Sequence, residues 1–162
     1  MRYRAVVVTV SDKGSAGQRT DTSGPLLQEM LAATYDVTGV LVVPDETLLI
    51  SEVIKEQVDR LGIDLVVTTG GTGVGPRDVT PEATRLVLEK ELPGFSEAMR
   101  MESFRITPFA LISRAVCGVR GQSIIVNLPG SPKAAAECLS FIKAAIPHAL
   151  EKVKGDPTDC AR

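Results

Sequence analysis

The sequence predicts a doubly wound α/β domain, in which helices cover both faces of a largely parallel β-sheet. Three observations lead to this fold class: short valine-rich runs, longer segments with helical spacing between them, and a composition that is 44% hydrophobic and 23% charged. Near-continuous apolar runs are typical of strands buried on both faces. Strands that alternate with helices form β-α-β crossovers, which make neighbouring strands parallel. A length of 162 residues suits one domain with one well-buried core.

The predicted elements follow one another along the chain. We expect strands at residues 3–9, 37–43, 63–69 and 123–128. We expect helices at residues 25–33, 48–61, 81–92, 95–106 and 132–146. The turn signal Arg120-Gly121 favours a short antiparallel strand at 111–119. The last segment, GDPTDCAR, has no apolar period, so we expect one domain at residues 1–154 and a flexible C-terminal tail at 155–162.

Composition and charge argue against several classes of function. A net charge of −2 without a lysine or arginine run argues against nucleic-acid binding. The apolar runs are shorter than the roughly 20 residues of a membrane helix, and the N-terminus leaves no room for a signal peptide, so we expect a cytoplasmic protein without membrane contact. Cys117, Cys138 and Cys160 lack a C-x-x-C pair, which indicates reduced thiols. A single histidine, His148, argues against histidine triads and multi-histidine metal sites.

The glycine-rich segment TTGGTGVGPRDVTPEAT, residues 68–84, follows a predicted strand and forms the first candidate site. It is not a Walker A loop, because proline and arginine follow its last glycine, and its glycine spacing differs from the dinucleotide fingerprint. Glycines let a ligand approach the main chain, and a guanidinium grips phosphate or carboxylate through its planar fork. A tight turn without a ligand is the alternative. We assign ligand binding to Gly70, Gly71, Gly73 and Arg77.

Three predicted helices begin with a hydroxyl residue and a proline, and each follows the carboxyl end of a predicted strand. They start at Ser23-Gly24-Pro25, Thr80-Pro81 and Ser131-Pro132. A hydroxyl can accept from the free N–H groups of the first turn, and proline suits that turn because it has no N–H to leave unpaired. Simple capping is one interpretation. The other is an anion site, because free N–H groups and positive dipole ends would face a common cleft.

Two aspartates follow predicted strands at the same edge of the sheet. Asp45 lies in VVPDE after one strand, and Asp78 lies in the glycine-rich segment after another. If the two strands lie near each other, the two carboxylates meet at one edge of the cleft, close to bound phosphate. Mg²⁺ prefers such hard oxygen ligands and shares its shell with phosphate and water. The alternatives are a helix N-cap for Asp45 and a capping or dipole role for Asp78.

Two further loops at this edge carry polar side chains. The first predicted strand leads into VSDKGSAG, and the last leads into NLPGSPKA. The first of these loops continues to Pro25, and loops of that length usually have a function. The candidate binding residues in these loops are Ser11, Asp12, Lys13, Ser15, Asn127, Gly130, Ser131 and Lys133. Together the loops predict a cleft for a phosphorylated substrate, or for a nucleotide with a metal ion.

Four segments resemble one known family. SDKGSAG, VVPDE, TTGGTGVGPRDVTPEAT and the stretch from PGFSEAM to NLPGSPKAAAEC are similar to the molybdopterin adenylyltransferases of the MogA/MoaB type, related to the G domain of gephyrin. The resemblance extends over residues 4–154. It implies a three-layer α/β/α domain, usually trimeric, that transfers AMP from ATP to the phosphate of molybdopterin and releases pyrophosphate. A molybdenum-insertion enzyme would use the product.

The resemblance also assigns residues. It places the two important acidic residues at Asp45 and Asp78, and the substrate-site residues at Ser15, Thr72, Ser103, Ser113 and Asn127. The phosphate monoester of molybdopterin has a second pKa of about 6, so this nucleophile needs no strong base. We therefore expect Asp45 and Asp78 to hold Mg²⁺. Phosphate would then be bound by Arg77, by Lys13 or Lys133, and by helix N-termini, including that at Thr80.

Three other functions stay open at this point. A non-catalytic paralogue would bind molybdopterin, or act as an assembly scaffold, without transferring AMP. A molybdenum-insertion enzyme shares this domain but carries additional domains, for which 162 residues leave no room. An α/β nucleotide-binding protein with unrelated chemistry is what the residues would indicate without the resemblance.

Overall fold

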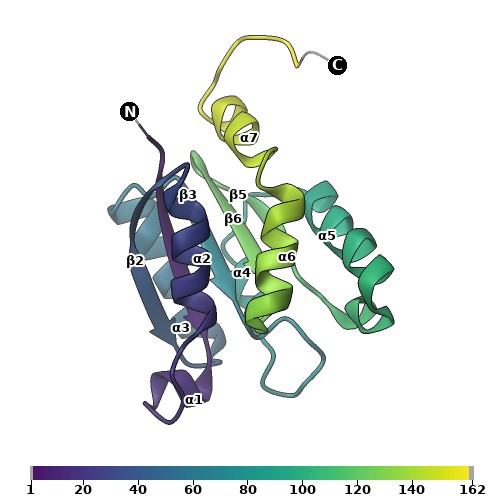
Figure 1. Cartoon of the computed structure of the whole chain (residues 1–162). Coiled ribbons are helices and arrows are strands. Elements are labelled where there is room, and N and C mark those ends of the chain that lie inside the picture. Colours follow the sequence, from purple (N-terminus) through teal and green to yellow (C-terminus); the bar gives the residue numbers. More distant parts are fainter. Residues whose placement is uncertain (1, 161–162) are drawn as a thin grey trace.

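A six-stranded sheet forms the centre of the molecule, with helices on both of its faces (Figure 1). The computed structural model describes residues 2–160. The strands are β1 (Arg4–Val10), β2 (Asp36–Val43), β3 (Leu65–Thr69), β4 (Lys90–Glu91), β5 (Cys117–Arg120) and β6 (Ser123–Leu128). The longer helices are α2 (Ser23–Ala32), α3 (Thr47–Lys55), α5 (Pro93–Ile106), α6 (Pro132–Ile142) and α7 (Ile146–Val153). The shorter ones are α1 (Asp12–Ser15), a π-helical turn η1 (Glu56–Arg60), α4 (Thr80–Arg85) and a 3₁₀ helix η2 (Pro108–Ile112).

The sheet has the strand order β2-β1-β3-β6-β5-β4. Strands β2, β1, β3 and β6 are parallel, whereas β5 runs antiparallel to β6 and β4 runs antiparallel to β5. The chain leaves β1 for β2 on one side and returns to β3 on the other, which creates a switch point between β1 and β3. The predicted fold class, a mostly parallel doubly wound sheet, is therefore confirmed.

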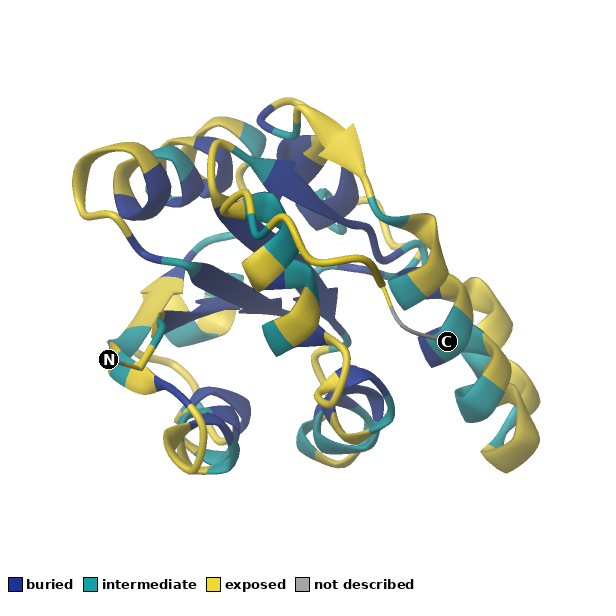
Figure 2. Cartoon of the chain, turned by 90° about the horizontal axis from the view of Figure 1, so that it is seen from above, coloured by how far each residue is buried: buried dark blue, intermediate teal, exposed yellow. Residues whose placement is uncertain are grey.

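The alternation of side chains along β1 explains the two helical layers. Ala5 and Val7 pack against α2, α5, α6 and α7, whereas Val6, Val8 and Val10 pack against α3, η1 and α4. Figure 2 shows the buried strands of the sheet between helices whose outer faces are exposed. Because successive strand residues point to opposite faces, a near-continuous apolar run serves both cores. The valine-rich runs from which strands are predicted therefore contain no alternating polar residues.

Two sequence predictions are wrong in the third quarter of the chain. The helix predicted at 81–92 ends at Arg85, and Lys90–Glu91 forms strand β4 instead. The N–H of Glu89 donates to the carbonyl of Val119 over 2.8 Å, so pairing with β5 replaces the last helical turns. The strand predicted at 111–119 begins only at Cys117, because the preceding residues include the 3₁₀ helix η2. In the first case the pairing partner lies far along the chain, so local periodicity does not reveal it.

The helix predicted at 132–146 is divided. Helix α6 ends at Ile142, and α7 begins at Ile146 with a proline in its first turn. Proline has no N–H for a continuing helix and suits a first turn, so Pro147 favours the break.

The C-terminal residues 155–160 form no helix or strand. Lys152 pairs with Asp156 over 3.1 Å and also donates to Thr158. The flexibility of the predicted tail stays a prediction, and residues 161–162 lie outside the described part. Among the described residues no helix combines the length and the apolar character needed to cross a membrane.

Candidate functional site

Three loops meet at the carboxyl edge of the sheet, as the sequence predicts. Thr69 at the end of β3 is in register with Thr9 of β1 and with Leu128 of β6. The hydroxyl of Thr69 donates to the carbonyl of Pro129 over 2.7 Å, and that of Ser23 donates to the carbonyl of Gly130 over 2.7 Å. The loops after β1, β3 and β6 therefore form one continuous surface, at the position where open α/β sheets bind ligands.

A polar cavity of about 410 Å³ lies at the switch point between β1 and β3. Its wall includes Thr9 and Val10 from the end of β1, and Thr69 and Gly70 from the end of β3. It also includes Ser23 and Pro132, where helices α2 and α6 begin. Helix N-termini present free N–H groups and a partial positive charge, so this cavity suits an anion.

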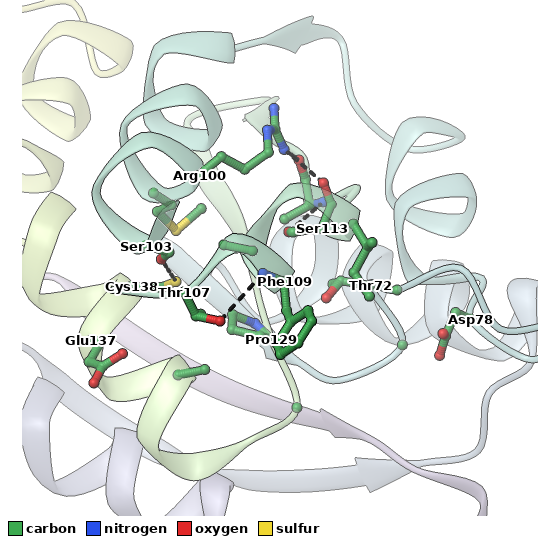
Figure 3. Close-up of a pocket in the computed structure, with 18 residues that line it drawn as sticks. Thr72, Asp78, Arg100, Ser103, Thr107, Phe109, Ser113, Pro129, Glu137 and Cys138 are labelled. Atoms are coloured by element: carbon green, nitrogen blue, oxygen red, sulfur yellow. Dashed lines mark hydrogen bonds between the residues drawn. The ribbon is translucent and has the colours of Figure 1, made fainter. Parts of the chain in front are cut away.

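An apolar cavity of about 430 Å³ lies next to it, between the glycine-rich loop, α5, η2 and α6 (Figure 3). Met99, Phe109, Ile112 and Cys138 supply apolar walls. Asp78 and Glu137 lie at opposite ends of this cavity. A mostly apolar cavity with a few polar groups is typical of a site for a ring-containing small molecule.

The candidate residues divide between these cavities. Gly71, Asp78 and Gly130 line both of them. The polar cavity alone is lined by Ser11, Asp45, Gly70 and Ser131. The apolar cavity alone is lined by Thr72, Gly73, Ser103 and Ser113. Seven candidates line neither cavity: Asp12, Lys13, Ser15, Arg77, Thr80, Asn127 and Lys133.

Asp78 lies where the two cavities adjoin, and the glycines of its loop make room for its carboxylate. Its Oδ2 accepts the N–H of Gly75 over 2.8 Å. A Cβ atom at Gly73 or Gly75 would come within 2.9 Å of the same oxygen. Real Cβ atoms essentially never approach an atom so closely, so a side chain at either position would displace the carboxylate. Asp78 thus closes its own loop instead of capping helix α4, which was one of its predicted alternatives.

Asp45 is held from the other side by the first loop. Its Oδ2 accepts the N–H of Asp12 over 2.8 Å, and its own N–H donates to Oδ1 of Asp12 over 3.0 Å. Burial raises the pKa of Asp45, and the negative charges of Asp12 and Asp78 raise it further. A Cβ on Gly71, whose φ is +65°, would lie 3.0 Å from Oδ1 of Asp45. Asp45 and Asp78 both line the polar cavity, and the charge of Asp78 contributes to the raised pKa of Asp45, so the two carboxylates lie at one edge of the cleft as predicted, although β1 separates the strands β2 and β3 that they follow.

Arg77 binds carboxylates of the protein itself. Its Nε and Nη2 donate to the two oxygens of Asp12 over 3.0 and 3.1 Å, and Nη2 also donates to Glu46 over 3.3 Å. Its hydrogen bond lowers the pKa of Asp12. The fork predicted to grip phosphate thus ties the glycine-rich loop to the loop after β1. A phosphate contact of Arg77 stays a prediction.

Asn127 and Thr80 are fully buried and bonded within the protein. The Nδ2 of Asn127 donates to the hydroxyls of Thr68 and Thr84, and its Oδ1 accepts the N–H of Val116 over 3.2 Å. The hydroxyl of Thr80 donates to the carbonyl of Gly70 over 2.8 Å. Neither side chain is open to a ligand here, and both instead hold the strands and loops that form the cavities.

The predicted hydroxyl caps are confirmed at one helix of three. The hydroxyl of Ser131 accepts the N–H of Ala134 over 3.4 Å. The hydroxyls of Ser23 and Thr80 are donors to loop carbonyls instead, as described above. At α2 the N-cap residue is Thr22, and the Oδ1 of the preceding residue, Asp21, accepts the N–H of Gly24 over 3.0 Å.

The other candidates that line neither cavity are mostly exposed. Lys13 and Ser15 are exposed on α1, and the side chain of Lys133 is 83% exposed and faces Glu137 at 4.0 Å. His148 is exposed on α7. Cys117 and Cys138 are buried free thiols, and Cys160 is an exposed one.

Sequence reasoning missed several residues of both walls. Arg19 and Asp21 line the polar cavity, in the segment QRTDTSGP. Asp21 could have been found, since an aspartate three residues before Gly24-Pro25 is an N-cap signal. No pattern marks Phe109 or Arg100 as part of the apolar cavity.

The cavities offer few ligands for a metal ion. Among the described residues no group of three or more His, Cys, Asp or Glu is placed to hold a metal. Asp45 and Asp78 are the carboxylates that line the polar cavity together with Asp21. Two carboxylates suit an ion that completes its shell with phosphate oxygens and water, as Mg²⁺ does.

Comparison with known proteins gives consistent matches over nearly the whole chain. Residues 6–148 match the family model described as "Probable molybdopterin binding domain". The chain is 44% identical over 154 residues to the molybdopterin adenylyltransferase of Helicobacter pylori strain J99, which covers 93% of this chain and 87% of that protein. The molybdopterin adenylyltransferase of Escherichia coli K12 is 37% identical, with 98% of this chain and 89% of that protein covered.

Two further matches concern a longer relative and a solved structure. The molybdenum cofactor synthesis protein cinnamon of Drosophila melanogaster is 44% identical over 152 residues. The chain spans only 25% of that relative's length, so it corresponds to one part of the longer protein. The crystal structure of the molybdopterin biosynthesis enzyme MoaB from Thermus thermophilus has a TM-score of 0.90 and 48% sequence identity, with 97% of this chain and 99% of that chain covered.

Proposed function

Because the chain belongs to the molybdopterin adenylyltransferase family, we propose that it adenylylates molybdopterin in molybdenum cofactor biosynthesis. The reaction transfers AMP from ATP to the phosphate of molybdopterin, and pyrophosphate is released. The observation that carries this proposal is the pair of adjoining cavities of opposite character, which share Gly71, Asp78 and Gly130. Two substrates can thereby meet at one carboxylate.

The character of each cavity assigns it a substrate. The polar cavity lies at the starts of two helices and has several hydroxyls and the cationic residue Arg19, so it receives the phosphates of ATP. The apolar cavity, with Met99 and Phe109, receives the pterin ring. The terminal phosphate of molybdopterin then lies near Asp78, where the cavities adjoin. Thr72, Ser103 and Ser113 can hydrogen-bond the pterin from the cavity wall.

Asp45 and Asp78 fit a site for Mg²⁺. Both carboxylates line the polar cavity. In each of them the backbone hydrogen bond is made by Oδ2, and Oδ1 is left for another ligand. The raised pKa of Asp45 reflects burial and negative neighbours, and a divalent cation would offset both effects. Asp45 and Asp78 would hold the ion, and the chemistry it would supply there is positive charge that offsets the negative charge of the leaving pyrophosphate.

The remaining chemistry depends on alignment. The attacking phosphate oxygen is already ionised near neutral pH, so the protein does not have to remove a proton with a strong base. The loops hold the two substrates so that this oxygen faces the α-phosphorus, in line with the leaving pyrophosphate. The positioning of the two substrates therefore takes the place of a strong basic side chain. The alternative of a paralogue that only binds molybdopterin is not favoured, since the matched curated relatives are named adenylyltransferases.

We also propose a homotrimer in the cytoplasm that delivers its product to a molybdenum-insertion enzyme. An exposed apolar surface on α5 and η2 supports self-association. It consists of Met101, Phe104, Ile106, Phe109, Leu111 and Ile112. Exposed apolar patches of this kind mark interaction sites in soluble proteins. Sedimentation equilibrium would give the mass of the assembly, and a monomer at micromolar concentration would contradict the trimer.

The test of the activity is a direct assay. Purified protein is mixed with molybdopterin, ATP and MgCl₂, and pyrophosphate release is measured while mass spectrometry identifies adenylyl-molybdopterin. We expect release only when all three are present, and less after EDTA treatment. Binding of molybdopterin without any pyrophosphate release would instead support the non-catalytic paralogue.

A further inference from the structure

Arg114 bridges the two ends of the loop that carries Asp78. Its Nε donates to the carbonyl of Gly73 over 2.7 Å, and its Nη2 donates to the carbonyl of Asp78 over 2.7 Å. Its backbone N–H donates to the carbonyl of Thr72 over 2.9 Å. Its Nη1 pairs with the carboxylate of Glu82 on α4. One side chain therefore holds the loop at its start, at its end and at the helix that follows.

The loop has few other restraints between these points. Residues 74–77 are exposed, and Arg77 is tied to Asp12 on the far side of the cleft. The carboxylate of Asp78 is bonded locally, by the N–H of Gly75. The position of that carboxylate therefore depends on where the backbone of Gly73 and Asp78 is held. The planar fork of arginine reaches both carbonyls and Glu82 at once, whereas a lysine carries all of its N–H donors on one nitrogen.

The neighbours of Arg114 connect this bridge to the apolar cavity. Ser113 and Ala115 line that cavity, whereas Arg114 between them faces the loop. The carbonyl of Ala115 also accepts from Arg100, another residue of the cavity wall, over 3.0 Å. The segment 113–115 is thus common to the pterin side and the Asp78 side of the site.

We propose that Arg114 is a positioning residue, which sets the Asp78 carboxylate relative to the apolar cavity through the carbonyls of Gly73 and Asp78. The inference rests on the proposed function for its effect on turnover, while the bridge itself is independent of it. Arg114 touches neither substrate in this assignment. Its loss should therefore lower kcat for AMP transfer and leave the KM for ATP nearly unchanged. A displacement of about 1 Å at a reacting group can cost roughly 100-fold in rate.

The chain offers two matched controls. Glu82→Gln removes the ion pair but keeps both carbonyl bonds of Arg114. Arg120→Lys changes another arginine, which pairs with Asp59 and donates to the carbonyl of Val87 at the opposite edge of the sheet. Arg120 therefore makes the same kinds of contact as Arg114, away from both cavities.

The experiment compares Arg114→Lys with these controls by two measurements. Amide hydrogen exchange reports on residues 73–78, and steady-state pyrophosphate release reports on turnover. For Arg114→Lys we expect at least tenfold faster exchange in that segment and a kcat reduced at least tenfold, with the KM for ATP within a factor of about two. Both controls should stay near the wild type in both measurements.

Each outcome has a definite meaning. Unchanged exchange in residues 73–78 of Arg114→Lys would overturn the bridge. Faster exchange with an unchanged kcat would overturn its positioning role, and so would a Glu82→Gln variant as impaired as Arg114→Lys. An inactive wild type would refute the proposed function, but the exchange data would still decide whether Arg114 holds the loop.

Discussion

The polar and the apolar cavity lie side by side but are built in different ways. The polar cavity is lined by residues at the ends of β1 and β3, at the starts of α2 and α6, and in the loops beside them. The apolar cavity consists of side chains from α5, η2 and α6, which pack together although they are far apart in the chain. An anion site thus follows from the topology of an open α/β sheet, whereas a site for a ring system depends on side chains brought together by packing.

Asp78, the carboxylate that lines both cavities, gives the largest expected effect. Asp78→Asn keeps an oxygen that can accept from Gly75 but removes the charge. We expect AMP transfer to fall by roughly 100-fold or more, because charge stabilisation by a metal ion is worth several kcal/mol. Molybdopterin binding, measured by fluorescence, should change little. Full turnover in this variant would remove Asp78 from the proposed metal site.

A change confined to the polar cavity should affect one substrate. Arg19→Ala removes a guanidinium from its wall. A hydrogen bond to a charged group is worth about 1.5–3 kcal/mol, so we expect the KM for ATP to rise roughly tenfold or more. The KM for molybdopterin should stay within about a factor of two. Equal effects on both substrates would contradict the division between the cavities.

The converse change fills the apolar cavity. Ala134→Phe places a large side chain in its wall, at the start of α6. We expect the KM for molybdopterin to rise about tenfold through lost contact area and steric exclusion, with the KM for ATP nearly constant. Circular dichroism would show whether the helix is retained. A rise in the KM for ATP alone would mean that the two assignments are reversed.

The smallest effect concerns the stability of the ligand-free protein. The pKa of Asp45 is raised by burial and by negative neighbours, so the folded state binds its proton more tightly than the unfolded state does. Below about pH 4, the ordinary aspartate pKa, Asp45 does not reduce the free energy of unfolding. As the pH rises through the raised pKa of the folded state, the carboxylate ionises and the free energy of unfolding falls. At pH 7 Asp45→Asn should raise the Tm by about 1–3 °C, and the gain should vanish near pH 3.

Addition of MgCl₂ provides the control for this prediction. The ion should raise the Tm of the wild type but not that of Asp45→Asn, since a ligand stabilises only the state that binds it. A variant less stable than the wild type at pH 7 would show that the hydrogen bonds with Asp12 outweigh the charge effect.

Parts of the site could be predicted because the relevant forces are local in the sequence. Asp45 and Asp78 each follow a recognisable strand, and parallel strands end at the same edge, so their meeting followed from the order of elements. Ser103 and Ser113 entered only through the family resemblance, because no local pattern distinguishes them from other helix and loop serines. Arg77 and Asn127 show the limit in another way. Their residue types suit a ligand, but protein groups now occupy their donors and acceptors.

Local sequence determines the valine-rich strands, most of the helices and the polar loops at the carboxyl edge, because hydrophobic periodicity and turn chemistry act over a few residues. Tertiary structure decides which polar groups face a ligand and which face the protein. It turns Arg77 towards Asp12, buries Asn127 and places Arg114 across the loop of Asp78. These contacts join residues far apart in the chain. A hydrogen bond forms between them only if the donor–acceptor distance is set to within a fraction of an ångström. Only the packed sheet and its two helical layers set such distances.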